Sequence, residues 1–207
     1  MAGDEKTGST DRLVWIDCEM TGLSLERDAL VEIAAIVTEP DLTELDAGIS
    51  IVIKPDDASL AQMDEFVVNM HTESGLIHEI PNGTTLQDAQ HRVLEYVKHH
   101  VPDARKAHLA GSSVYVDRGF LARDMPELDA HLHYRVVDVS SIKELVRRWY
   151  PRVYFATPPK TGNHRALADI RESIAELRYY RDAVFVADAS DSDALKAIAE
   201  NHIVDHG

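Results

Sequence analysis

The chain has 207 residues, of which 44% are hydrophobic, and a formal net charge of −15. This length suits one domain with a sizeable core, and the absence of any run of about 18 apolar residues excludes a membrane-spanning helix. No Lys- or Arg-rich run offers the basic face with which proteins grip long nucleic acid, so a nucleic-acid substrate would be short. From charge alone, an ordinary acidic solubility bias is an equal explanation.

The ends of the chain and its cysteine indicate where it works. The N-terminal region has no basic start followed by an apolar core and a cleavage site, and the single cysteine cannot form an internal disulfide. We therefore expect a soluble protein of the reducing cytoplasm. We expect residues 1–11 to be disordered, residues 12–187 to form one domain, and residues 188–207 to be an acidic C-terminal tail of unknown role.

Strands and helices alternate along the domain. Apolar and β-branched runs predict strands over 13–16, 28–39, 47–54, 107–116 and 135–139, the first three forming an antiparallel start. Helical spacing predicts helices over 87–100, 117–131 with a break at Pro126, 142–150, and 165–181. Ser141, three residues before Glu144, forms a capping-box pattern at the start of 142–150. The alternation predicts an α/β fold in which helices flank a mixed β-sheet.

The first strand carries a pair of acids. It reads LVWIDCEMTGL over residues 13–23, and because strand side chains alternate between faces, Asp17 and Glu19 project to one side and Cys18 to the other, into the core. Two carboxylates on a rigid strand suit a hard cation such as Mg²⁺ or Mn²⁺, and a second ion can share one of them. An isolated D-x-E is more often a strand that runs into a polar turn, so the decision depends on other residues.

Further acids stand where later elements end. Asp117 follows a buried strand, and Asp169 lies five residues after His164 in the first turns of a helix. Four carboxylates gathered without a nearby Lys or Arg would repel one another strongly unless divalent metal neutralised them. His164, in a loop, could accept a proton from water near neutral pH.

The order D-x-E, D, H-x₄-D resembles the DEDDh branch of the DEDD 3′–5′ exonucleases, which share an RNase H-like fold. The resemblance is closest to members that act on short RNA and runs through WIDCEMTGL, MDEFVVNMHTESGL, GSSVYVDRGFL, HYRVVDVSSIKEL and GNHRALADIRESI. It implies a 3′–5′ exoribonuclease that hydrolyses short RNA oligonucleotides, dinucleotides preferred, to 5′-mononucleotides. It also implies two metal ions per site, Mg²⁺ or Mn²⁺, bound by Asp17, Glu19, Asp117 and Asp169, with His164 as the general base.

The same resemblance implies how substrate is bound. Leu23 matches the leucine that wedges between two bases, and Phe66 stands where the family most often has a stacking tryptophan. His71 and Tyr134 match residues near the substrate, Tyr134 being supplied by the other subunit of a homodimer. The residues that match the cap on the 5′ phosphate are Ser113, Arg135, Ser140 and Ser141.

Other interpretations fit parts of the pattern. The opening D-x-E-x-T-G resembles the D-x-D-x-T of haloacid-dehalogenase-like phosphatases, in which Asp17 would be the nucleophile and His164 would have no role. A catalytically silent nucleotide-binding module would have lost one of the five catalytic residues, and none is lost. Leu23 and Phe66 also fit plain apolar packing. Asp138 is expected to be a structural carboxylate near a helix start rather than a fifth metal ligand.

Overall fold

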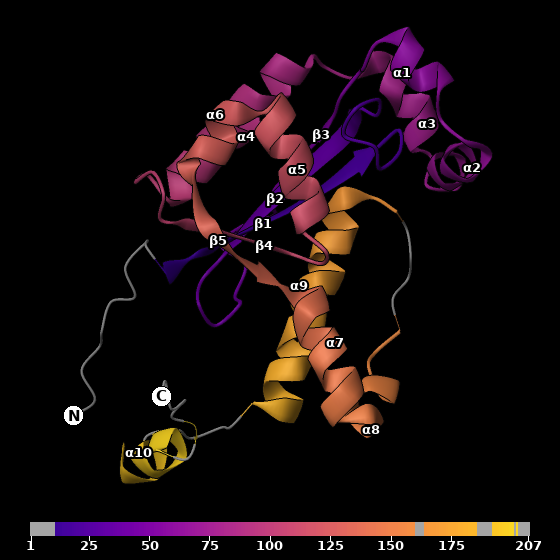
Figure 1. Cartoon of the computed structure of the whole chain (residues 1–207). Coiled ribbons are helices and arrows are strands. Elements are labelled where there is room, and N and C mark those ends of the chain that lie inside the picture. The colour runs from indigo at the N-terminus through magenta and orange to yellow at the C-terminus, as the bar shows by residue number, and fades with distance from the viewer. Residues whose placement is uncertain (1–10, 160–163, 186–191, 201, 203–207) are drawn as a thin grey trace, which may run out of the picture.

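The computed structural model describes residues 11–159, 164–185, 192–200 and 202, and these build on one mixed sheet (Figure 1). Its strands are β1 (Leu13–Met20), β2 (Leu30–Thr38), β3 (Ile49–Val52), β4 (Ala107–Gly111) and β5 (Leu132–Asp138), in the order β3-β2-β1-β4-β5. β1 pairs antiparallel with β2, which pairs antiparallel with β3, while β1 with β4 and β4 with β5 are parallel. The predicted α/β class, mixed sheet and antiparallel start are confirmed.

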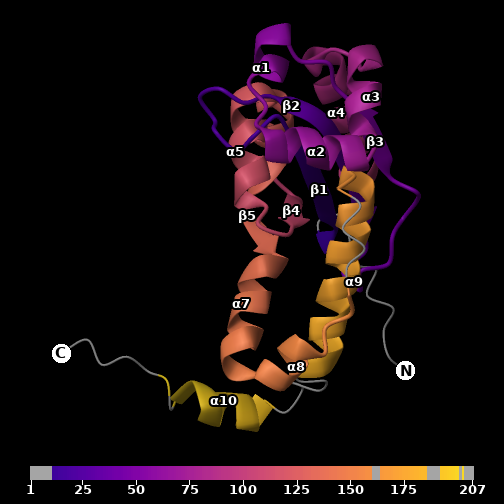
Figure 2. The ribbon, with the colours of Figure 1, turned by 90° about the vertical axis from the view of Figure 1, so that its right-hand side faces the viewer.

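Helices cover both faces of this sheet. They are α1 (Asp57–Ala61), α2 (Glu65–Glu73), α3 (Leu76–Glu79), the 3₁₀ turn η2 (Ile80–Asn82), α4 (Leu86–His100), α5 (Tyr115–Asp124), α6 (Pro126–His131), α7 (Val139–Trp149), α8 (Pro151–Phe155), α9 (Ala166–Val184) and α10 (Ser192–Glu200). In Figures 1 and 2, α4, α5 and α6 lie on one side of the sheet, and α7 and α9 lie side by side on the other. No helix in the described ranges is long and apolar enough to cross a membrane.

The alternation of β1 decides which side chains face which helices. Even-numbered side chains, Cys18 among them, pack with α4, α5 and α6 in one core cluster, whereas Trp15 packs with α7 and α9 in another. Asp17 and Glu19 follow Trp15 at intervals of two, so they share its face and turn toward α9. The prediction that Cys18 is a buried core thiol is confirmed.

Several predicted boundaries were wrong, two of them at Ser113 and Ser141. The strand predicted over 107–116 ends at Gly111, because Ser113 adopts the left-handed backbone conformation (φ 54°) and turns the chain into α5. The capping box at Ser141 is not used: α7 already begins at Val139, and the carboxylate of Asp138 accepts a hydrogen bond from the Ser140 N–H (2.9 Å) at its start. Asp138 is therefore the structural carboxylate that was predicted.

The proposed domain limits stay a prediction. Of the N-terminal segment predicted to be disordered, residues 1–10 lie outside the described residues. The predicted C-terminal tail, 188–207, contains α10, and most of its other positions are likewise outside them.

Candidate active site

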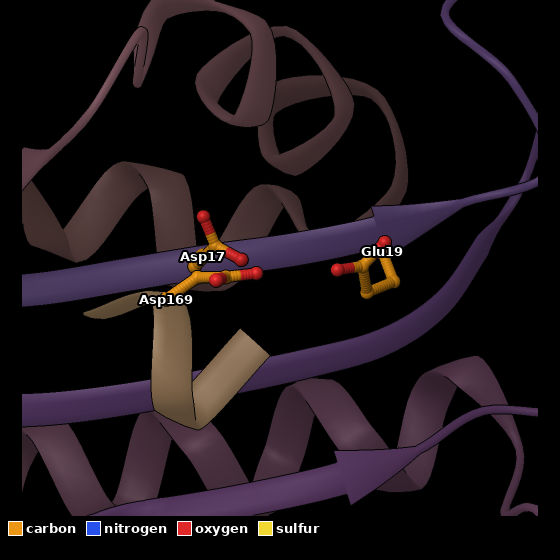
Figure 3. Close-up of side chains that lie close together, drawn as sticks. All are labelled: Asp17, Glu19 and Asp169. Atoms are coloured by element: carbon orange, nitrogen blue, oxygen red, sulfur yellow. The ribbon is translucent and has the colours of Figure 1, made fainter. Parts of the chain in front are cut away.

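Three carboxylates converge where β1 meets the start of α9. Asp17 and Glu19 come from β1 and Asp169 from the first turn of α9, and ligand oxygens of the three lie within 4.8 Å of one another. Figure 3 shows the carboxylates of Asp17 and Asp169 next to each other, with that of Glu19 facing them. Strand alternation and the packing of α9 on β1 thus bring together acids 150 residues apart in the sequence, as predicted.

The fourth predicted acid approaches from another element. Asp117 lies in the first turn of α5 and is buried, and its Oδ1 accepts a hydrogen bond from the backbone N–H of Cys18 (2.9 Å). Its oxygens are not part of the 4.8 Å set, but its charge acts on Asp17. This bond ties α5 to β1 between the two acids of the strand.

Burial and mutual repulsion oppose ionisation of these groups. Burial, followed by the charges of Asp117, Glu19 and Asp169, raises the pKa of Asp17 well above its usual range. Burial and the neighbouring acids raise the pKa of Glu19 to about 8, and burial raises that of Asp117 to about 7. Hard oxygen donors whose charges repel in this way fit a divalent cation, which neutralises them.

Two residues that the sequence analysis missed complete the surroundings of the cluster. Glu32 of β2 stands opposite Glu19 in the strand register and is buried, and Arg165 donates hydrogen bonds to it (Nη2 to Oε1, 3.1 Å). Arg165 also lowers the pKa of Glu19, an effect smaller than those of burial and the nearby acids. The expectation of a cluster with no nearby Lys or Arg was therefore wrong. A glutamate within the apolar run LVEIAAIVT was the available signal.

His164 lies exposed immediately before α9, with its backbone in the left-handed region (φ 48°). His71 is fully buried: its Nε2 lies 2.8 Å from the carbonyl oxygen of Met20, which can only accept, so this nitrogen carries the proton. Its Nδ1 lies 4.0 Å from Glu19 Oε2 and has no hydrogen-bond partner in the described part of the chain. His71 thus presents an unused acceptor beside the carboxylates.

A pocket of about 480 Å³ opens beside Glu19. Leu23, which follows β1, lines it together with Phe66 and Met70 of α2. Phe66 is 74% exposed, so the interpretation of Phe66 as core was wrong, and Leu23 is 75% exposed on the surface. An apolar slot next to a carboxylate cluster can hold the flat rings of a ligand while a charged group of the same ligand lies at the carboxylates.

The predicted phosphate-cap residues are only partly gathered. Ser113 Oγ donates a hydrogen bond to Ser140 Oγ (3.0 Å), and Asp138 Oδ1 accepts from the backbone N–H of both serines. Arg135 is exposed on β5, with its guanidinium 5.4 Å from the centre of the Tyr134 ring. Ser141 is exposed in the first turn of α7. Within the described ranges, no hydrogen bond links the side chain of Arg135 or Ser141 to the serine pair.

The mixed sheet with a carboxylate cluster at β1 and α9 belongs to an exonuclease domain, as the match to a family model shows. A family model named RNase_T and described as "Exonuclease" matches residues 14–177. The fold is similar to that of exonuclease I, with a TM-score of 0.63 and 16% identity over 83% of this chain, and to the zinc-bound complex of E. coli exonuclease I with single-stranded DNA, also at 0.63 and 16%, over 84%. The chain spans 41% of the length of each.

Curated relatives narrow the class. The chain is 62% identical to the oligoribonuclease of Streptomyces coelicolor over 95% of this chain and 99% of that protein. It is 59% identical to that of Leifsonia xyli, over 95% of both. The chain belongs to the oligoribonuclease family and is a 3′–5′ exoribonuclease. The resemblance found in the sequence is confirmed, and the phosphatase and silent-module alternatives are rejected.

Proposed function

We propose that this exoribonuclease hydrolyses short RNA, preferring dinucleotides with a 5′ phosphate, to 5′-mononucleotides, with two divalent ions, Mg²⁺ or Mn²⁺, in each site. The observation that carries the proposal is the adjacency of the carboxylate cluster to the slot lined by Leu23 and Phe66. The names of the relatives, oligoribonuclease, support an oligonucleotide substrate.

Four carboxylates would hold the ions: Asp17, Glu19, Asp117 and Asp169. Bound there, divalent cations supply neutralisation of the phosphate charge and a more acidic water. The burial that raises the pKa of Glu19 to about 8 supports this role, because it makes ionised oxygens favourable only with a cation present. The acids of β1 would fix the position of the ions, and Asp169 would join them from α9.

His164 acts as the general base. Its exposed position in the segment that leads into α9 leaves the imidazole accessible for the proton of the attacking water, and its neutral form is the active one. His71, whose buried Nδ1 lies 4.0 Å from Glu19 Oε2, stands near the substrate behind Glu19. His164 then contacts the reacting end of the substrate.

Two bases occupy the slot. Leu23 wedges between them and Phe66 stacks on one face, with the smaller ring area of phenylalanine than tryptophan weakening that stack. Beyond the second nucleotide, the 5′ phosphate is capped by Ser113, Arg135, Ser140 and Ser141. Arginine presents a rigid fork of donors that matches phosphate oxygens, so this contact dominates binding outside the metal site. A capped 5′ end leaves no path for a third nucleotide.

A homodimer completes each site in this proposal. Tyr134 is 72% exposed on the edge strand β5, which suits a side chain that reaches into the site of a partner subunit. The acidic surface, net charge −15, gives no support to long nucleic acid as a partner.

The test compares kcat/KM for two-nucleotide and seven-nucleotide RNAs of matched sequence. We expect the dinucleotide to be preferred, and Arg135→Ala to weaken dinucleotide binding by more than about 1.5 kcal/mol and to narrow the difference between the two lengths. Arg152→Ala, at an exposed arginine of α8, is the control and should leave both values unchanged. Equal kcat/KM values, or a preference for the longer RNA, would contradict the capped site.

A further inference from the structure

Arg165 connects three parts of the fold from a position directly after His164. Its guanidinium donates to Glu32 of β2 (Nη2 to Oε1, 3.1 Å) and to Glu79 of α3 (Nη1 to Oε1, 2.7 Å). Its backbone carbonyl accepts the N–H of Asp169 (3.0 Å), which is part of the first turn of α9. One residue therefore fastens the start of α9 to the sheet and to α3.

Glu32 is occupied on both oxygens by groups that hold this segment. Oε1 accepts from Ser50 Oγ (2.7 Å) and from Arg165, and Oε2 accepts from Arg165 Nε (3.2 Å) and from the Ala166 N–H (3.2 Å). A carboxylate that is 1% exposed and fully hydrogen-bonded is not available as a metal ligand. The charge of Glu32 adds to the repulsion within the carboxylate cluster. Any benefit of Glu32 to the site must therefore come from the segment that its hydrogen bonds hold in place.

What it holds is a segment in a conformation that needs support. His164 has φ 48°, and the left-handed region is unfavourable for a non-glycine residue. The residues on its C-terminal side are fixed by Glu32 through one side-chain and one backbone donor. Charged hydrogen bonds at a buried acceptor are among the stronger ones in proteins. They can therefore offset the strain at His164.

We propose that Glu32 and Arg165 are positioning residues for the hydrolytic step: the pair holds the start of α9 so that His164 and Asp169 face the acids of β1. This rests on the roles given to His164 and Asp169 in the proposed function. The ion pair between Arg165 and Glu79 contributes less to this positioning, because Glu79 is about half exposed and solvent screens the pair.

The chain offers a matched control on the same helix. Arg171 of α9 donates to Glu44 (Nε to Oε2, 3.3 Å) and to the backbone carbonyl of Ala47 (2.8 Å). This pair also ties α9 to the segment between β2 and β3, but it lies beyond Asp169, and within the described residues its hydrogen bonds reach none of the four acids. Loss of the pair between Arg171 and Glu44 therefore shows how much an ion pair that anchors α9 contributes to stability without any effect on the site.

The experiment measures kcat and KM on a 5′-phosphorylated dinucleotide, with melting temperatures, for Glu32→Gln, Arg165→Gln, the double variant and Arg165→Lys. We expect each single variant to lower kcat about 10- to 100-fold, as small misplacements of catalytic groups do, with KM within about threefold. The double variant should be no slower than the slower single one, because both changes break one interaction. Arg165→Lys should recover part of kcat. Arg171→Gln and Glu44→Gln should change kcat less than about twofold.

Two results would overturn the proposal. One is a folded Arg165→Gln protein whose kcat lies within twofold of Arg171→Gln, and since Arg165 is partly exposed, this variant remains informative if Glu32→Gln fails to fold. The other is additive loss in the double variant. His164→Ala, measured in parallel, tests the proposed function separately. Full activity of His164→Ala would reject His164 as the general base. An inactive His164→Ala together with a fully active Arg165→Gln would reject only the positioning role of Glu32 and Arg165.

Discussion

At the scale of single residues, the carboxylates of the site repel one another when they are ionised. Asp17, Glu19 and Asp169 present oxygens within 4.8 Å in a largely buried place, where each ionised group makes the next harder to ionise. The metal-free protein is therefore strained by the groups that are proposed to bind metal. Activity and stability should respond oppositely when one acid is neutralised.

Asp17→Asn should abolish hydrolysis and stabilise the metal-free protein. The amide keeps the shape of the side chain but loses the charge needed to bind a cation, and it removes a like charge from a buried cluster. Turnover with Mg²⁺ or Mn²⁺ and melting in EDTA would measure the two effects. Glu95→Gln, on the exposed side of α4, is the control and should change neither. Near wild-type turnover in folded Asp17→Asn would refute its role as a metal ligand.

Glu19 should make the metal-free protein less stable as pH rises. Its pKa is about 8 in the fold against 4.5 ordinarily, so between these values the folded chain keeps a proton that the unfolded chain has lost. The unfavourable contribution grows through this window and is complete above about pH 8.

Denaturant unfolding in EDTA at pH 5, 6, 7 and 8 would measure this effect in wild type and Glu19→Gln. The stability advantage of Glu19→Gln should increase with pH, and comparison of the two proteins cancels the titration of groups that behave alike in both. Metal binding near pH 7 should also release protons, because the ion displaces them from the acids. An advantage that is constant from pH 5 to pH 8 would show that Glu19 is ionised in the metal-free fold.

At the scale of elements, what could be predicted was what depends on local pattern. The apolar alternation of β1 correctly placed Asp17 and Glu19 on one face, and the helical spacing after His164 correctly placed Asp169 in the first turns of α9. Starts and ends were less certain because distant contacts decide them. The Ser113 N–H bonds to Asp138, 25 residues away, and Asp138 starts α7 ahead of Ser141.

The contact between Glu32 and Arg165 was hidden for the same reason. The two residues are 133 positions apart, and although Arg165 lies in the stretch GNHRALADIRESI, no motif used in the sequence analysis pairs it with Glu32. A glutamate in a fully buried strand could be recognised as unusual, but its partner depends on how α9 packs against the sheet. Pattern thus identified the acids of the site, and only packing identified what supports them.

The turn after β1 depends on a glycine. Asp28 Oδ2 accepts the Ser24 N–H (2.8 Å) beneath the turn, and a Cβ on Gly22 would come within 2.5 Å of that oxygen. Gly22→Ala should displace Asp28 and with it Leu23, weakening dinucleotide binding, and the overpacking should destabilise the fold by about 1–3 kcal/mol. Metal affinity should be unchanged.

Dinucleotide titration, with Mn²⁺ titration in parallel, would measure both quantities for Gly22→Ala. Ser24→Ala is the control, because it keeps the backbone donor to Asp28 and should bind as wild type does. Unchanged dinucleotide affinity in Gly22→Ala would mean that Leu23 does not depend on this turn.

At the scale of the whole molecule, exposed aromatic side chains stand out on an acidic protein. Tyr134 is 72% exposed on the edge strand, and Trp149 and Phe155, from α7 and α8, are 66% and 82% exposed. Large apolar groups left in water favour association when a complementary surface exists. A two-fold dimer would make the exchange of Tyr134 between subunits reciprocal.

Hybrid dimers should recover activity from two inactive chains. Asp17→Ala and Tyr134→Ala proteins, mixed and allowed to exchange subunits, would form dimers in which one site has an intact Asp17 and receives Tyr134 from the partner. Hydrolysis should then appear on mixing. Asp17→Ala mixed with the Asp17→Ala, Tyr134→Ala double variant should stay inactive. A fully active monomer at nanomolar concentration, measured by sedimentation, would refute the shared site.

The bond between Cys18 and Asp117 has a consequence for mutational tolerance. The donor is the backbone N–H, while the thiol side chain points into the core with the other even-numbered residues of β1. Replacements of Cys18 that fit the core keep this donor, and only proline abolishes it. The backbone anchor of Asp117 is therefore insulated from the substitutions that core positions commonly accumulate, whereas replacement or oxidation of Cys18 removes the further hydrogen bond between its thiol and this carboxylate.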